Sequence, residues 1–331
     1  MYDSIFSPIL TFANEQPLIP KREIQRTLDR IEDSFVSDAE SILDKQANIL
    51  MRKASPLINR GDDAGIRALE WGVAGKFRKP IYQVWDSGFL AGGSDAIAEM
   101  RAAIPDEALD EVQRASRIVT FTLNPQQRSA IQALLRLRPV RLRSLPLEQA
   151  ILQRSILLSG GFSDGLLDGY LDGAGRYHRG LKDHMLAAIF PQETTGVPIS
   201  RDELVRRIEG TLDIGTKAAR RICRTESTTG YNRARDITMQ QSTLVDYYRF
   251  LSISDNRTSD ICDSRNGMLI PADDRAAIEE NTPAMHPNCR STISPVMTSI
   301  NPEHAKWSRD RRRDYQQRNL VPLPQGWRLA A

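Results

Sequence analysis

The stretch TKAARRICRTESTTGYNRARDITMQQSTLVDYYRFLSI, residues 216–253, changes its hydrophobic period part-way along. Up to about Val245, small and apolar residues return every three or four positions, as on one face of a helix. The residues close to that stripe are Ala219, Ile222, Gly230, Ala234, Ile237 and Leu244. From Tyr247 the period becomes two, which predicts a strand. A long helix that leads into a strand predicts a small sheet after residue 246.

Two further segments complete this sheet. Asn266 and Gly267 form a pair typical of tight turns, and the apolar residues 268–270 follow directly. Residues 291–296 form the candidate third strand. We therefore expect a short antiparallel sheet in a compact α+β domain.

One acidic residue, Glu226, falls within the apolar stripe of the helix. Since an unpaired buried carboxylate is costly, we expect an arginine or backbone donors to hold it. Arg257 is the favoured partner, and the alternative places Arg257 in a solvated turn. Asp255 is expected to cap backbone donors of that turn. Arg290 has the same two interpretations, and a structural hydrogen-bonding role is favoured for it.

Helical periods dominate the sequence before residue 195. Pro56 is the expected stop of the first helix, and the Lys79-Pro80 pair is expected to separate the next two. The first 20 residues carry three prolines and no period, which indicates an extended arm. The expected helices cover residues 21–54, 63–77, 82–103 and a segment from about residue 147.

Glycines recur at intervals of four at residues 161, 165, 169 and 173, with a shorter echo at Gly88 and Gly92. A glycine stripe lets another backbone approach closely, so one interpretation is a tightly packed helix pair. The other is a loop punctuated by turns, because each glycine costs a helix about 1 kcal/mol relative to alanine.

A change of composition at residues 190–198 marks a domain boundary. Beyond it, Ser200 and Glu203 have the spacing of a capping box, and the helix they begin is expected to stop near Gly210 or Gly215. The predicted fold is mainly α with a small α+β C-terminal domain. Its parts are an extended arm (1–20), a helical domain (21–195), the α+β domain (196–297) and an extended tail (298–331).

The composition excludes several classes of protein. A net charge of +3 over 331 residues argues against a dedicated nucleic-acid binder. The chain has no run of about 20 apolar residues for a membrane helix, and its first residues do not resemble a secretory signal. Three cysteines do not form a disulfide framework, which indicates a protein made and kept in a reducing cytoplasm.

An ordered series of short motifs occupies residues 224–292. It comprises Arg224-Thr225-Glu226, Tyr231-Asn232, Asp255-Asn256-Arg257-Thr258, Cys262, Gly267 and His286-Pro287-Asn288-Cys289-Arg290. This series resembles the C-terminal domain of phage head-morphogenesis proteins of the Mu F-like minor head family, over roughly residues 200–297. Members of that family often carry further cysteines near two positions that hold Ser259 and Ser291 here.

The resemblance implies a structural minor head protein of a tailed phage. Such a protein binds the portal vertex and assists head assembly and DNA packaging or delivery. The implied location is the virion, at the portal vertex of the head, after synthesis in the host cytoplasm. The implied partners are the portal protein and the major capsid or scaffold protein, with no membrane in the assembled head.

Cys262, His286 and Cys289 form a C-x23-H-x2-C arrangement that suits zinc. A structural zinc site needs a fourth ligand, for which Asp255, Asp260 and Asp263 are the nearest candidates. The alternative is that His286 bonds a backbone carbonyl while both cysteines pack as small buried side chains.

The sequence argues against an enzyme, because it contains neither a phosphate-binding P-loop motif nor an H-E-x-x-H motif. The tail after residue 298 carries an arginine cluster at 309, 311–313 and 318 that could touch packaged DNA through its phosphates, but two aspartates partly offset it. The alternative function is therefore a zinc-stabilised DNA-binding module acting at packaging or ejection.

Overall fold

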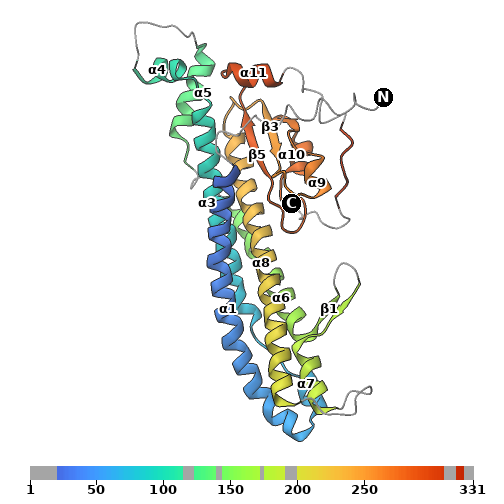
Figure 1. The fold of residues 1–331 in the computed structure, drawn as a ribbon. Coiled ribbons are helices and arrows are strands. Elements are labelled where there is room, and N and C mark those ends of the chain that lie inside the picture. The colour runs from blue at the N-terminus through green and yellow to red at the C-terminus, as the bar shows by residue number, and fades with distance from the viewer. Residues whose placement is uncertain are drawn as a thin grey trace, which may run out of the picture. The chain divides into compact units, whose positions relative to one another are not determined.

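The computed structural model describes residues 21–114, 123–138, 144–171, 175–190, 200–308 and 318–323 (Figure 1). The predicted arm at 1–20 and most of the predicted boundary at 190–198 lie outside these residues. The chain forms two compact units. The helical unit consists of Ile31–Val84 and Ser144–Cys223, and the mixed unit contains the remaining residues. Each unit is compact in space but is made of separate segments of the sequence. The predicted domain boundaries stay a prediction.

The helical unit packs around one apolar core. Its elements are α1 (Lys21–Arg60), α2 (Asp63–Arg67), α3 (Ala74–Ala102), α6 (Leu145–Asp168), β1 (Tyr170–Leu171), β2 (Tyr177–His178), α7 (Leu181–Ile189) and α8 (Arg201–Gln240), of which α1, α3 and α8 also supply residues to the mixed unit. Phe77 of α3 meets Phe162 of α6 edge to face, with ring centroids 4.9 Å apart. Leu43 of α1 and Leu181 of α7 are buried in the same core.

The two prolines expected to end helices lie inside them. Pro56 is within α1, which continues to Arg60, and Pro80 is within α3. A proline removes one backbone hydrogen bond and costs a helix about 3 kcal/mol. Here the flanking turns contribute to the core, since Ala54 and Phe77 are buried. Burial of those turns outweighs the local preference, so the predicted stops were wrong.

The predicted helix stop near Gly210 or Gly215 was also wrong. Helix α8 runs without interruption through Gly210 and Gly215. In α6, a side chain at Gly161 would meet nothing within 4 Å, and one at Gly165 would make only ordinary contact. Gly161 and Gly165 therefore support no close approach of a second backbone, and Gly173 lies outside the described residues. Gly169 is the C-cap residue of α6 at φ 85°, and a Cβ there would lie 2.7 Å from the His178 carbonyl oxygen of β2.

Close helix packing does occur in the mixed unit, between α3 and α8. A Cβ at Gly92 would lie 2.0 Å from the carbonyl oxygen of Tyr231, and one at Gly88 would lie 2.5 Å from that of Ser227. From the other side, a Cβ at Gly230 would lie 2.6 Å from the carbonyl oxygen of Trp85. Only glycine fits at these three positions without a shift of the backbone.

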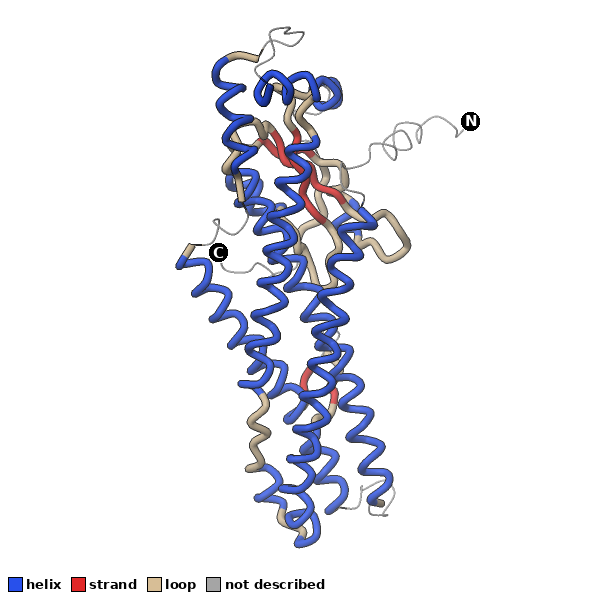
Figure 2. Tube along the Cα trace, turned by 90° about the vertical axis from the view of Figure 1, so that its left-hand side faces the viewer, coloured by secondary structure: helices blue, strands red, loops and turns tan. Residues whose placement is uncertain are grey.

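The remaining elements of the mixed unit pack around a three-stranded sheet, drawn in red in Figure 2. They are α4 (Asp106–Arg114), α5 (Pro125–Arg136), β3 (Tyr247–Leu251), α9 (Asp260–Asp263), β4 (Leu269–Pro271), α10 (Arg275–Asn281), β5 (Thr292–Val296) and α11 (Pro302–Ser308). The sheet is antiparallel with β3 at its centre, in the order β4-β3-β5. Tyr248 lies opposite Ile270 on one side and Pro295 on the other. The predicted fold class, mainly α with a small antiparallel sheet after residue 246, is confirmed.

The C-terminal segment, predicted to be extended, begins with helix α11. Farther on, Leu320 and Leu323 pack against the core of the mixed unit. Arg318 donates to the carbonyl oxygens of Ser264 and Asn266, at 3.2 and 2.8 Å. The described part of this segment therefore folds back onto its own unit.

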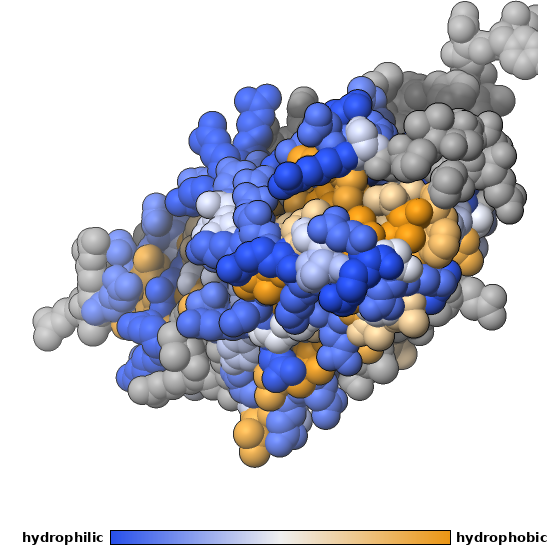
Figure 3. All heavy atoms as spheres, turned by 90° about the horizontal axis from the view of Figure 1, so that it is seen from below, coloured by the Kyte–Doolittle hydropathy of each residue, from blue (hydrophilic) through white to orange (hydrophobic). Residues whose placement is uncertain are grey.

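The coloured part of the face drawn in Figure 3 is largely hydrophilic, with patches of hydrophobic residues between the polar ones. Four of the exposed large apolar side chains lie on α6: Leu145, Leu152, Ile156 and Leu157. Among the described helices, none combines the length and the apolar character that a membrane span requires.

Candidate metal centre and its supporting network

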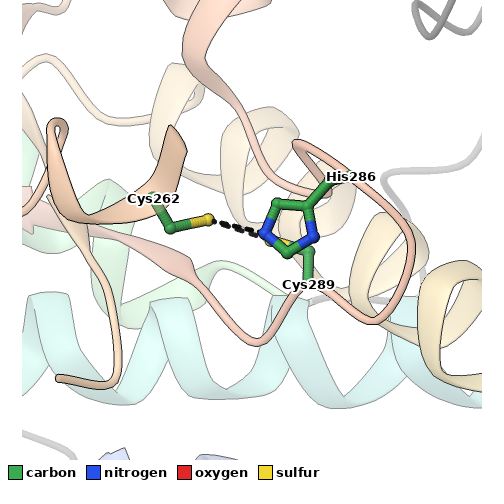
Figure 4. A group of neighbouring side chains, drawn as sticks. All are labelled: Cys262, His286 and Cys289. Atoms are coloured by element: carbon green, nitrogen blue, oxygen red, sulfur yellow. Dashed lines mark hydrogen bonds between the residues drawn. The ribbon is translucent and has the colours of Figure 1, made fainter. Parts of the chain in front are cut away.

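Two short segments bring Cys262, His286 and Cys289 together (Figure 4). Cys262 lies in α9, whose first turn is capped by the Ser259 hydroxyl, which accepts from the Cys262 amide at 3.3 Å. His286 and Cys289 lie in the connection between α10 and β5. The spacing of the three residues predicted this cluster from the sequence.

The three candidate ligand atoms lie within 4.8 Å of one another. Cys262 Sγ is 3.1 Å from His286 Nε2 and 3.7 Å from Cys289 Sγ. The two cysteines are buried, at 3% and 0% exposure, and His286 is partly buried. Asp255, Asp260 and Asp263, the predicted candidates for a fourth ligand, are not members of this cluster.

The turn that carries His286 and Cys289 is fastened to α8. Within the turn, the Cys289 amide donates to the His286 carbonyl at 3.1 Å, and Asn288 adopts a left-handed conformation at φ 61°. The Asn288 amide donates to Thr225 Oγ1 at 3.2 Å, and Thr228 Oγ1 donates to the Cys289 carbonyl at 2.9 Å. Thr225, predicted as a signature residue, thus helps to fix the position of the candidate ligands.

Hydrogen bonds surround the imidazole and the thiols. His286 Nδ1 donates to the Pro287 carbonyl at 2.8 Å, and Ser259 Oγ lies 2.7 Å from His286 Nε2. The Cys289 thiol, with further help from His286 and the Ser291 side chain, lowers the pKa of Cys262. Burial raises the pKa of Cys289, and the hydrogen bond with Cys262 raises that of His286. The arrangement favours a thiolate at Cys262, the form in which cysteine binds metals and reacts as a nucleophile.

The predicted turn after β3 is built around Asp255. Its carboxylate accepts two hydrogen bonds from the Arg290 guanidinium, at 2.7 and 2.8 Å, and one from the Arg257 amide at 2.9 Å. The bonds from Arg290 hold the pKa of Asp255 well below its usual range. The Asp255 amide donates to Thr258 Oγ1 at 3.0 Å, and that hydroxyl donates to the Ile253 carbonyl. Asp255 therefore caps backbone donors as predicted, and Arg290 has the structural role favoured for it.

Glu226 is 2% exposed, so its predicted burial is confirmed. Arg257 has an exposed side chain, and its pairing with Glu226 stays a prediction. Arg224 lies next to the buried segment of α8 and is itself partly buried. Gly267 adopts φ 75° in the turn before β4, so the tight turn that the Asn-Gly pair predicted is present.

A buried ion pair escaped the sequence analysis. Arg235 of α8 and Glu99 of α3 are both fully enclosed, and the guanidinium donates to the Glu99 carboxylate. Arg235 also donates to the Ile293 carbonyl at 2.6 Å, while Ser294 Oγ donates to Glu99 at 3.0 Å. Arg235 lies four residues after Tyr231, and its guanidinium donates to the Tyr231 hydroxyl at 3.3 Å. This spacing was a local signal that Arg235 faces inward. Nothing in the sequence indicated its partner, which lies 136 residues away.

A second polar contact joins α8 to the edge of the sheet. The Asn232 side chain donates to the Ser291 carbonyl at 3.1 Å and accepts from the Ile293 amide at 3.1 Å. The Asn232 side-chain amide thus makes two hydrogen bonds to the backbone at β5, as a neighbouring strand would. Asp236 accepts two bonds from Arg275 at 2.9 and 3.0 Å, which ties α10 to the same helix.

Comparison with known proteins finds a family match for the part of the chain that contains the candidate metal ligands. Residues 198–294 match the model of a protein family described as Phage Mu protein F like protein. The match runs from α8 into the first part of β5 and includes the candidate metal ligands and the Asp255–Arg290 pair. Searches of the curated proteins and of the solved structures found no match.

Proposed function

From the family match, we propose that this chain is a structural minor head protein of a tailed phage. The match over residues 198–294 carries the proposal, since that family indicates a phage head-morphogenesis protein located in the virion. The finer proposal is that the chain binds the portal vertex and assists head assembly and DNA packaging or delivery. The portal protein is the proposed main partner, and the major capsid or scaffold protein is a further one.

The polar groups of the mixed unit support a structural role more than a catalytic one. Glu99 is engaged by Arg235, and Asp255 by Arg290. The first contact joins helix α3 to helix α8, and the second joins the turn after β3 to the connection before β5. We therefore propose that the chain is not an enzyme.

The exposed apolar side chains on α6 support docking through the helical unit. Leu145 and Leu157 are 72% and 74% exposed, and Leu152 and Ile156 are 46% and 42% exposed. Leu145, Leu152 and Ile156 are spaced seven and four apart, so they lie along one side of the helix. Burial of such side chains in a protein partner contributes about 25 cal/mol per Å² of apolar surface. A portal surface is the partner that the family match suggests.

The test is co-purification with the portal protein of the same phage. The Leu152→Glu/Ile156→Glu double variant adds two charges to the exposed apolar side of α6. The matched control, Ser37→Glu/Ser41→Glu, adds the same two charges at exposed polar positions of α1, away from this side of α6 in the sequence. We expect the wild-type chain and the control to co-elute with the portal, and the Leu152→Glu/Ile156→Glu variant to elute separately. Separate elution of the wild-type chain would refute portal binding.

The alternative function, a zinc-stabilised DNA-binding module, draws on the Cys-His-Cys cluster. Most of its proposed basic segment lies outside the described residues, and Arg318 is engaged with carbonyl oxygens of its own unit. Binding to packaged DNA would appear as an affinity that falls steeply as the salt concentration rises. Absence of salt-dependent binding by the full chain would refute this alternative.

A further inference from the structure

The two sulfurs of the cluster lie at the separation that a tetrahedral metal requires. With a zinc–sulfur bond of about 2.3 Å, tetrahedral geometry sets two thiolates about 3.8 Å apart. Cys262 Sγ and Cys289 Sγ are 3.7 Å apart. A disulfide would instead require about 2.05 Å. The same geometry places sulfur and imidazole nitrogen about 3.6 Å apart, so the 3.1 Å between Cys262 Sγ and His286 Nε2 needs a shift of about 0.5 Å.

The imidazole is oriented for coordination through its outer nitrogen. Because the Pro287 carbonyl can only accept, Nδ1 of His286 carries a proton and donates it at 2.8 Å. This bond leaves Nε2 as the atom that faces the sulfurs. Metal-binding histidines characteristically donate their second ring nitrogen to a carbonyl or carboxylate in this way.

The surroundings of the cluster are those of an enclosed, preorganised site. The two cysteines are 3% and 0% exposed, and bonds from Thr225 and Thr228 fix the turn that carries Cys289. Two thiolates and an imidazole are donors that suit zinc, whereas calcium and magnesium prefer oxygen ligands.

We propose that Cys262, His286 and Cys289 bind one zinc ion. The Ser259 hydroxyl, 2.7 Å from His286 Nε2, lies beside the fourth coordination position, which a solvent molecule would fill. The ion would join α9 to the connection between α10 and β5, which are 24 to 27 residues apart in sequence. The proposal does not depend on the function in a phage head.

The test uses the full chain, reduced, stripped of metal with a chelator and titrated with Co²⁺, a coloured substitute for zinc. We expect one Co²⁺ per chain, with tetrahedral absorption bands and a thiolate charge-transfer band, and displacement of Co²⁺ by added Zn²⁺. The Cys262→Ala variant should lose these bands. The matched control, Cys223→Ala, removes a buried cysteine outside the cluster and should keep them.

A gain-of-ligand variant protects the test against misfolding of Cys262→Ala. Ser259→Cys places a thiolate beside His286 Nε2 and should lower the zinc Kd by at least about tenfold, because a thiolate replaces solvent. An unchanged zinc Kd in Ser259→Cys would overturn the proposal. So would a reduced wild-type chain that binds no Co²⁺, or Co²⁺ bands that persist in a folded Cys262→Ala chain.

Discussion

Replacing Gly92 with alanine would place a methyl group where helix α8 already lies. The new Cβ would lie 2.0 Å from the carbonyl oxygen of Tyr231, about 1.4 Å closer than ordinary van der Waals contact. The atom it meets belongs to the backbone, so the contact cannot be relieved by rotating a side chain. Either α3 or α8 must move, although Tyr231 is fully buried and donates through its hydroxyl to Asp95 at 2.6 Å.

The expected cost follows from two opposing terms. Overpacking of this kind costs about 1–3 kcal/mol, and occasionally more. Alanine recovers about 1 kcal/mol of helix propensity relative to glycine. With a backbone atom in the way, the upper end of the packing cost applies. We therefore expect Gly92→Ala to lose about 2 kcal/mol of unfolding free energy.

Gly161→Ala in α6 is the matched control, because a methyl group there meets nothing within 4 Å. It should gain up to about 1 kcal/mol from helix propensity alone. Urea unfolding, followed by circular dichroism and tryptophan fluorescence, should give a lower midpoint for Gly92→Ala and an equal or higher one for Gly161→Ala. Equal midpoints for Gly92→Ala and the wild type would refute the close packing of α3 and α8.

Three further outcomes are expected. Arg235→Met leaves Glu99 buried without its arginine partner and should lower the free energy of unfolding in urea by about 3–5 kcal/mol. The double variant with Glu99→Leu should restore most of this stability. A loss below about 1 kcal/mol for Arg235→Met would contradict a stabilising role for the ion pair. Thr228→Val removes a hydrogen bond to the turn that carries the candidate ligands, so zinc affinity by chelator competition should fall about 10–100-fold, and an unchanged affinity would show that this bond does not position them. Asp255→Asn should lower the thermal midpoint at pH 7. Because Arg290 holds the pKa of Asp255 below its ordinary value of 3.8, the Asp255 carboxylate stabilises the fold fully above that pH, and this stabilisation is lost as the pH falls through the lower folded pKa. A difference in thermal midpoint between variant and wild type that stays constant down to pH 2 would contradict this reasoning.

The sequence predicted the local part of the fold well. The switch of period at Tyr247 placed β3, and the Asn266-Gly267 pair placed the turn before β4. Both signals depend only on neighbouring residues. Ser200 also behaves as predicted, since its hydroxyl accepts from the Glu203 amide at 3.2 Å.

The failures share one physical cause, which is that packing overrides local helix preference. Prolines 56 and 80 and glycines 210 and 215 lie inside long helices despite their local cost. Each cost is about 1–3 kcal/mol, and burying one large apolar side chain contributes a comparable amount. The core partners that supply this energy are distant in sequence, so a local pattern cannot reveal them.

The candidate site divides in the same way. The C-x23-H-x2-C spacing predicted the cluster, because two ligands share one turn and the third lies in a nearby capped helix. The bonds from Thr225 and Thr228 to that turn span 63 and 61 residues and could not be read from spacing. The resemblance to the Mu F-like family marked Thr225 without giving its physical role, which the structure supplies.

The most direct test of the central proposal is quantitative mass spectrometry of mature particles of the source phage, with the portal and major capsid proteins as internal references. The proposal predicts a chain present in low copy number, comparable with the portal and far below the major capsid protein, and enriched with the portal after gentle disruption of the heads. Absence of the chain from purified particles would contradict its assignment as a structural protein of the phage head.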